Sequence, residues 1–217
     1  MGRARLRPTG SHSAELTPAT FADVHAADPT APDGTYTLLN GGKGLTLYCF
    51  DMAGTPREYV TLVNTGTGTN FSQYTAGGAS PGTDVRTTFS KLRIYPATLT
   101  VDIGDLTFAT STGSLDHAGS GTQVTSMPYG VAMSCTSNPD GLGNIDLRGT
   151  SFTVADTFDV GGAGASGSAT PSSGNKVIDL TGGGFCGWIT PDPPMFNPFN
   201  PQPGNFALNL ADNAVAT

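Results

Sequence analysis

The chain has 217 residues, 30 of them glycine, and a formal net charge of −7. This length is enough for one domain with a buried core. Three of its ten Lys and Arg residues stand at the extreme N-terminus, so the rest of the chain is more acidic still and lacks the clustered cations that bind nucleic acid or anionic membranes. The sequence contains no run of about 18 apolar residues, so it predicts no membrane-spanning helix.

The composition favours strands over helices. Lys occurs at three positions and Glu at two, although both are common on helix surfaces. Short stretches rich in Thr, Val, Tyr and Phe lie between Gly and Pro residues, which is typical of short strands. We predict a mainly β fold, an antiparallel sheet or sandwich-like single domain with a short N-terminal helix and long Gly/Pro-rich loops.

The first residues predict a tail outside the fold. Residues 1–12 have a basic start but no apolar core, so they are not an intact signal peptide. Gly10-Ser11-His12 is typical of a cloning remnant. We expect residues 1–13 to be such a remnant or a disordered tail, residues 14–217 to form the domain, and the native export signal to be missing, which implies a secreted, extracellular protein.

A helix is predicted at residues 18–27. Thr17 is a suitable N-cap and Pro18 suits the first helical position. Apolar residues recur every third position, and Pro29 ends the run. The helix is therefore short and amphipathic.

Alternating runs bounded by Gly, Pro, Asn and Asp follow the helix. In the clearest run, Leu45, Leu47 and Cys49 share one face of a strand. The same pattern predicts strands at residues 35–38, 45–50, 58–63, 88–95, 98–103, 106–109, 129–135, 144–147, 151–154, 176–180 and 206–210.

Four segments are predicted as loops. Residues 66–79 and 111–125 are polar, and residues 161–174 are of low complexity and expected to be mobile. Residues 191–204 contain six prolines, which cannot pair as a central strand. We expect the loop at 66–79 and the Pro/Phe-rich segment at 191–204 to be the contact elements of a binding module.

The motifs of common hydrolases are missing. The sequence has no HExxH zinc motif, and His117 has no Gly-x-Ser-x-Gly partner. Glu58 is the only Glu after residue 15, and its neighbours indicate a structural role at a strand end. We predict that the chain is not an enzyme. A hydrolase using paired Asp carboxylates remains an alternative.

Calcium is the best small ligand that the sequence indicates. Oxygen-bearing side chains gather in a Gly-containing stretch, as hard cations require, but without EF-hand spacing. The alternative, which we favour, is a plain β-turn at residues 138–141. The weak candidates are Asn138, Asp140, Asn144 and Asp146. No other cofactor is predicted.

Three cysteines and one sequon complete the candidate sites. The cysteines lack CxxC spacing, so the simplest arrangement in an exported chain is one disulfide and one free thiol. Asn70 begins an Asn-Phe-Ser glycosylation sequon that we place in a loop.

Several motifs together resemble one family. Tyr-Cys-Phe-Asp-Met at residues 48–52 is followed by Pro-Arg-Glu-Tyr-Val-Thr-Leu-Val at residues 56–63. The chain resembles the GON domain, a module at the C-terminus of one branch of secreted ADAMTS metalloproteases that also occurs in bacterial exported proteins. Further matching motifs lie in the family's order at residues 70–72, 89–94, 105–110, 145–150 and 183–187.

The resemblance has implications for the cysteines. The helix and first strands are also similar to fibrinogen-like modules, in which a Cys near the helix start bonds the Cys of the Tyr-Cys strand. Phe21 stands at that position here, which implies a buried, unpaired Cys49 and a disulfide between Cys135 and Cys186. Three free thiols, or a bond from Cys49 to either of the others, are the alternatives.

The resemblance also implies a function. We expect a monomeric, non-catalytic extracellular recognition or adhesion module that is appended to, or related to, secreted metalloproteases. Its partner would be an extracellular protein, the matrix or a cell-surface glycan. The alternatives are a structural subunit of a surface layer or appendage, and the carboxylate-based hydrolase.

Overall fold

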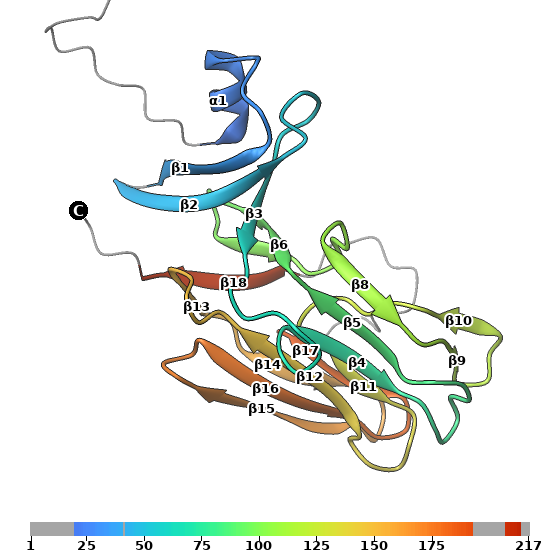
Figure 1. Ribbon diagram of the computed structural model, residues 1–217. Helices are drawn as coiled ribbons and strands as arrows, with labels where there is room; N and C mark the ends of the chain where they lie inside the picture. The colour runs from blue at the N-terminus through green and yellow to red at the C-terminus, as the bar shows by residue number, and fades with distance from the viewer. Residues whose placement is uncertain (1–19, 41, 193–206, 214–217) are drawn as a thin grey trace, which may run out of the picture.

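The computed structural model describes residues 20–40, 42–192 and 207–213, and it is mainly antiparallel β, as predicted (Figure 1). One helix, α1 (Phe21–Ala27), precedes the strands. The strands are β1 (Gly34–Asn40), β2 (Lys43–Phe50), β3 (Arg57–Thr61), β4 (Phe71–Thr75), β5 (Val85–Phe89), β6 (Lys91–Tyr95), β7 (Thr100–Asp102), β8 (Ala109–Thr112), β9 (Leu115–His117), β10 (Thr122–Val124), β11 (Ala132–Ser134), β12 (Gly141–Asp146), β13 (Phe152–Val154), β14 (Phe158–Gly161), β15 (Ser166–Ser172), β16 (Val177–Gly183), β17 (Gly187–Pro191) and β18 (Ala207–Asp212).

Two large sheets make up the domain. The first has the order β1-β2-β3-β6-β7-β18-β13. The second runs β14-β17-β11-β4-β12-β16-β15, with β5 and β8 attached through β4. In Figure 1 the first sheet and α1 form the upper part of the molecule, and the second sheet forms the lower part. The hairpin β9–β10 lies at the far end of the second sheet.

Strand β18 closes the first sheet. It pairs with β7 on one side, from Ala207↔Asp102, and with β13 on the other, from Asp212↔Phe152. Three segments far apart in the sequence therefore lie side by side, and a late part of the chain holds two earlier parts together.

The second sheet divides at β4. One edge of β4 pairs with β5, and the other pairs with β12 at Phe71 and Ser72 and, in parallel, with β11 from Gln73 to Thr75. Strands β11 and β12 therefore both pair with β4 and come close to each other. Gly141 makes this possible, because a Cβ there would overlap the Met133 backbone.

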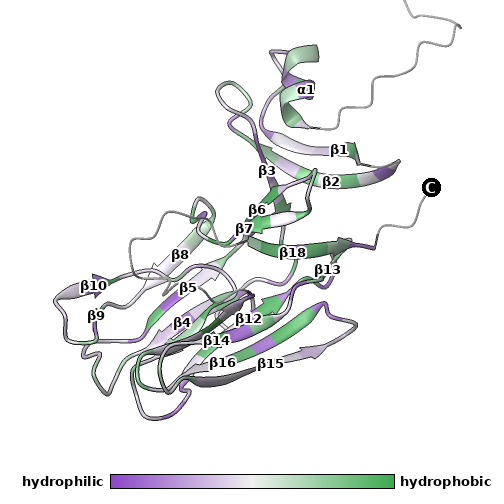
Figure 2. Cartoon of the chain, turned by 180° about the vertical axis from the view of Figure 1, so that it is seen from behind, coloured by the Kyte–Doolittle hydropathy of each residue, from purple (hydrophilic) through white to green (hydrophobic). Residues whose placement is uncertain are grey.

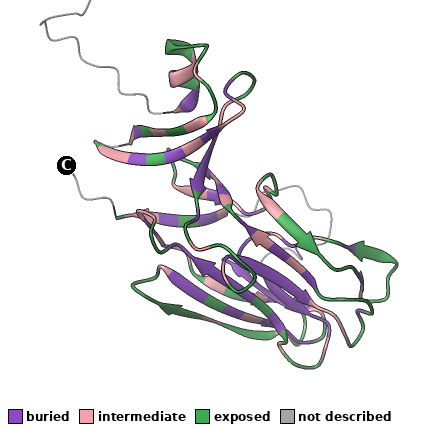
Figure 3. Ribbon diagram, in the orientation of Figure 1, coloured by how far each residue is buried: buried purple, intermediate pink, exposed green. Residues whose placement is uncertain are grey.

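Apolar residues from both sheets form one continuous core. Leu45, Leu47 and Cys49 are buried as predicted, at relative exposures of 1% or less. Figures 2 and 3 show this pattern, with apolar and buried positions concentrated on the central strands and polar, exposed positions along β15 and the loops.

The helix is present but begins later than predicted. Thr20 is the N-cap, and its side chain and that of Asp23 form a capping box. Reciprocal capping satisfies two backbone donors at once, which favours this start. The cap predicted at Thr17 lies outside the described residues. The predicted end at residue 27 is confirmed.

Several assignments were wrong because pairing between strands overrides local composition. The polar loop predicted at residues 111–125 contains the end of β8 and the paired strands β9 and β10. Part of the loop predicted at 66–79 is strand β4, a central strand of the second sheet. Part of the low-complexity loop at 161–174 is β15, which pairs with β16 along seven residues. Residues 106–108 form a turn before β8 and not a strand. Of the Pro-rich segment, residues 193–204 lie outside the described residues.

The 88–95 run is two strands, β5 and β6, which belong to different sheets. Ser90 separates them, and its backbone N–H donates to the Phe108 carbonyl at 3.0 Å. Within the described ranges, no helix is both long and apolar enough to cross a lipid bilayer.

Candidate functional site

The outer face of the first sheet carries a cluster of aromatic rings and cations. The β2–β3 and β3–β6 ladders place Tyr48 opposite Tyr59, and Tyr59 opposite Arg93. The Phe108 ring reaches this face from the turn before β8, at centroid distances of 4.8 Å from Tyr59 and 5.3 Å from Phe50. We call Tyr48, Phe50, Arg57, Tyr59, Lys91 and Phe108 the aromatic–cation cluster.

Two cations of the cluster are held by rings. The Lys91 ammonium lies 4.7 Å from the centroids of both Tyr48 and Phe108. The Arg57 guanidinium lies 5.3 Å from the Phe50 centroid. Within the described part of the chain neither has a carboxylate at ion-pair distance, so these charges are open to an incoming anion.

A groove of about 540 Å³ lies next to the cluster. It opens where the β2–β3 ladder ends at the Tyr48–Tyr59 pair, and the turn at residues 149–152 forms its other wall. Thr46 lies two residues before Tyr48 on the same face of β2, and Thr61 pairs with Lys91. The lining is Thr35, Gly44, Thr46, Leu47, Val60, Thr61, Gly149, Thr150, Ser151 and Phe152.

Hydroxyl groups dominate the groove wall. Thr35, Thr46 and Thr61 are exposed. The hydroxyls of Thr35, Thr61 and Ser151 have no hydrogen-bond partner among the described residues, so they can donate to and accept from a ligand. We call this the hydroxyl groove.

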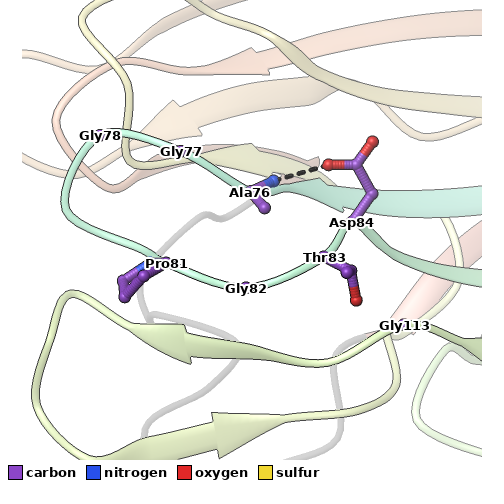
Figure 4. Close-up of a pocket in the computed structure, with 8 residues that line it drawn as sticks. All are labelled: Ala76, Gly77, Gly78, Pro81, Gly82, Thr83, Asp84 and Gly113. Carbon is purple, nitrogen blue, oxygen red and sulfur yellow. Dashed lines mark hydrogen bonds between the residues drawn. The ribbon is translucent and has the colours of Figure 1, made fainter.

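A second depression lies at the opposite end, over the loop at residues 76–84 and beside Gly113 (Figure 4). The Asp84 carboxylate accepts from the Ala76 backbone N–H at 2.8 Å and from Gln73 Nε2 at 3.3 Å. The one carboxylate lining this depression therefore fastens its own loop. Glycine and backbone form most of the remaining wall.

The same loop is attached to the body through a buried polar cluster. The Tyr74 hydroxyl lies 2.6 Å from Ser80 Oγ, 2.9 Å from His117 Nδ1 and 2.9 Å from Cys135 Sγ. Burial raises the pKa of Tyr74 and lowers the pKa of His117. His117 falls within the polar loop predicted at residues 111–125. It lies instead on β9 and packs against Tyr74, because the chain folds back there.

The four calcium candidates do not converge. Asp140 precedes β12, and its carboxylate accepts from the Thr136 hydroxyl. Asn144 and Asp146 lie within β12, where the backbone is extended and not looped. Asn144 bonds Asp179, while Asp146 bonds Arg148 and Asn64. Asn138 is exposed and only its backbone is used. The described residues hold no cluster of three or more His, Cys, Asp or Glu suited to a metal ion.

Asn70 lies in the bend before β4, in a loop as predicted, but its side chain is buried. Its Nδ2 donates to the Asn64 and Asp146 carbonyls at 2.8 Å each, and its Oδ1 accepts from Tyr129 and from the Asp146 N–H. The side chain is fully buried. A glycan would replace one of the two Nδ2 hydrogens and remove a donated bond, and the buried side chain is closed to solvent, so in the folded domain this sequon is not an acceptor site.

The cysteines are arranged as the family resemblance implied. Cys135 and Cys186 form a disulfide. Cys49 is a free and fully buried thiol. Burial, with a smaller effect of the Glu58 charge, raises the pKa of the Cys49 thiol to about 12. The thiol therefore stays protonated and behaves as a small apolar side chain.

Residues 18–80 and 79–196 match the GON domain family, and the two stretches cover most of the chain. This chain belongs to the GON domain family. Over an alignment of 206 residues, the chain is 27% identical to "A disintegrin and metalloproteinase with thrombospondin motifs gon-1" from Caenorhabditis elegans. The match covers 81% of this GON domain chain and 9% of the relative, so the chain corresponds to a small part of a far longer protein. No solved structure matches the chain.

Sequence reasoning missed both the hydroxyl groove and the aromatic–cation cluster. The local signal was present, since Tyr48, Phe50 and Tyr59 lie in the motifs that indicate the family. What the sequence could not show is that Phe108 and the turn at 149–152 reach the same face of the sheet.

Proposed function

We propose that this GON domain is a non-catalytic recognition module that acts outside the cell, within or beside a secreted metalloprotease. Three observations support this proposal. The family is one found with ADAMTS-type proteases, the chain matches only 9% of its ADAMTS relative, and it contains a disulfide of the kind that persists in oxidising compartments.

The observation that carries the proposal is the hydroxyl groove with its adjoining aromatic–cation cluster. A binding site is concave, partly apolar and equipped with a few polar groups that are not used internally. The groove has free hydroxyls at Thr35 and Thr61, and the cluster beside it has two cations without carboxylate partners among the described residues. We therefore place the contact surface on the outer face of the first sheet.

The contacts of the ionisable side chains also support a non-catalytic role. Glu58 binds Arg93, Asp146 binds Arg148 and His117 binds Tyr74. Each of these contacts fastens one part of the fold to another. They give structural roles to Glu58 and His117, the two side chains that the sequence analysis weighed individually for chemistry.

A binding array tests the proposal. The full 217-residue chain is applied to immobilised matrix proteins, matrix glycans and cell-surface glycans, with calcium and with chelator. A Thr61→Arg variant fills the groove, and Thr170→Arg, on exposed edge strand β15, is the matched control.

We expect at least one component to bind the wild type and the control but not the groove variant. Binding that the groove variant retains would show that the contact surface lies elsewhere. A chain that binds nothing on the array, or that turns over a peptide, ester or glycoside, would overturn the recognition function itself.

A further inference from the structure

We infer that the ligand of the hydroxyl groove is an acidic saccharide, a chain of sugar rings bearing sulfate or carboxylate groups. This inference rests on the recognition function proposed above and specifies its ligand. It combines three properties of one surface: the hydroxyls of the groove, the aromatic rings at its end and the cations above those rings.

The groove wall matches the hydroxyl groups of a sugar. Each hydroxyl of Thr35, Thr61 and Ser151 can donate one hydrogen bond and accept others, as can each sugar hydroxyl. These features favour a polar ligand over an apolar one.

The groove leads directly to an aromatic ring with a cation above it. Thr46 and Tyr48 lie on the same face of β2, and Thr61 pairs with Lys91 on β6. A saccharide lying along the groove thus reaches the partly exposed Tyr48 ring, whose face can pack against the C–H groups of a sugar. The Lys91 ammonium, 4.7 Å from that ring centroid, stands where an acidic substituent would project.

The charge distribution favours an acidic ligand at this place. The chain carries a net charge of −7, so most of its surface repels anions. Other cations are engaged elsewhere, for example Lys43 with Asp212 and Arg148 with Asp146. Lys91 lies over Phe108 and Arg57 lies over Phe50, and the centroids of these two rings are 5.3 Å apart. They provide two cations on one aromatic cluster for acidic groups of the saccharide.

An acidic peptide fits this surface less well. A peptide that adds to a sheet needs pockets for alternate side chains. The groove offers threonine, serine and glycine at most positions, and its apolar members Leu47, Val60 and Phe152 belong to the core. The wall therefore lacks the apolar pockets that anchor peptide side chains.

The test measures binding of four probes to the full chain by isothermal titration. The probes are a sulfated heparin oligosaccharide, the same saccharide after desulfation, an unsulfated hyaluronan oligosaccharide with carboxylates only, and poly-glutamate of similar charge. The variants are Lys91→Met with Arg57→Met, which keep the packing over the rings, and Thr61→Val, which keeps the shape but removes a hydroxyl. Arg86→Met is the matched control, since Arg86 stacks on Phe71 in the second sheet, 3.8 Å from its centroid.

We expect the sulfated or carboxylated saccharide to bind, and the double variant to bind it about tenfold more weakly, given roughly 0.2–1 kcal/mol for each exposed charge contact. Thr61→Val is expected to weaken it severalfold, and Arg86→Met to leave it unchanged. Sulfate dependence is read from the desulfated arm and carboxylate recognition from the hyaluronan arm. The wild-type affinity should fall as salt is raised, which requires no variant.

Poly-glutamate binding as tight as the saccharides, unaffected by Thr61→Val, would overturn the inference in favour of an acidic peptide. Saccharide binding that does not weaken as salt is raised would also overturn it, as would saccharide binding that is retained by both the Lys91→Met/Arg57→Met double variant and Thr61→Val. If the array instead identifies a protein that binds through the groove, the recognition function is supported and only the inference of an acidic saccharide is overturned.

Discussion

Arg93 donates to the Glu58 carboxylate at 2.7 Å, at the point where the β3–β6 ladder ends. The same guanidinium nitrogen also donates to the Glu58 and Ile94 carbonyls. The other Glu58 oxygen accepts from the Phe21 backbone N–H at 3.1 Å. One buried ion pair therefore connects α1, β3 and β6, which is the structural role that the sequence indicated for Glu58.

Because Glu58 is only 6% exposed, removing it leaves Arg93 without its carboxylate and Phe21 without its acceptor. We expect Glu58→Ala to lower the free energy of unfolding by about 3–5 kcal/mol, as for other buried pairs that lose one partner. Urea denaturation measures the change. Lys43→Ala, which breaks the looser pair with Asp212, should cost less than about 1 kcal/mol. Equal losses in the two variants would contradict this account.

The Cys49 thiol gives a prediction at alkaline pH. Its pKa is raised to about 12 from 9.0, chiefly by burial, so the folded state disfavours the thiolate. The contribution of the protonated Cys49 thiol to the free energy of unfolding is fully present below pH 9 and is lost as the pH rises toward 12. The free energy of unfolding of the wild type should therefore fall faster between pH 9 and 10.5 than that of Cys49→Val. In the native protein, a thiol reagent at pH 8 should react only after denaturant is added, and rapid labelling would be evidence against burial.

Asn70 is expected to be among the most sensitive polar positions. It occupies all four side-chain hydrogen-bonding sites in the core and has a φ of 49°, which asparagine tolerates better than most residues. Asn70→Ala should destabilise the domain by about 3 kcal/mol or more, because several buried groups lose their partners. The exposed Asn138→Ala is the control and should change stability by less than about 0.5 kcal/mol. Chemical denaturation of both variants checks the difference.

His117 should make the loop at residues 76–84 sensitive to acid. Burial lowers the pKa of His117 in the folded state below 6.5, so protonation favours unfolding. Above pH 6.5 His117 is neutral in both states and does not destabilise the fold. As the pH falls below 6.5, the unfolded state takes up a proton more readily, and the free energy of unfolding decreases. Comparing wild type with His117→Gln at pH 7.5 and pH 5 isolates the effect. A steeper acid loss in the variant than in the wild type would show that the sign is wrong.

Local patterns predicted the strands of the first sheet well. The alternation around Leu45, Leu47 and Cys49 identified a half-buried strand, and Glu58 marked the next one. These elements follow from period-two patterning and turn residues that lie close together in the sequence. The disulfide followed from the family resemblance and not from the spacing of the cysteines.

Local patterns could not predict which distant segments of the chain pair with each other. Strand β15 consists of small polar residues and is a strand because it pairs with β16. The groove was missed for a similar reason, since its walls come from residues 35–61 and 149–152, which meet only in the folded chain. Sequence spacing placed the calcium candidates in one loop, whereas the extended β12 separates them.

The position of β18 affects how this domain can be produced in fragments. The family match ends at residue 196, yet β18 begins at Ala207 and lies between β7 and β13. A protein cut at the end of the family match would lack an interior strand, and the backbone groups of Val101 and Thr153 would be left unpaired at two new sheet edges. Such edges invite pairing with other molecules, so a truncated version is expected to aggregate where the longer one does not.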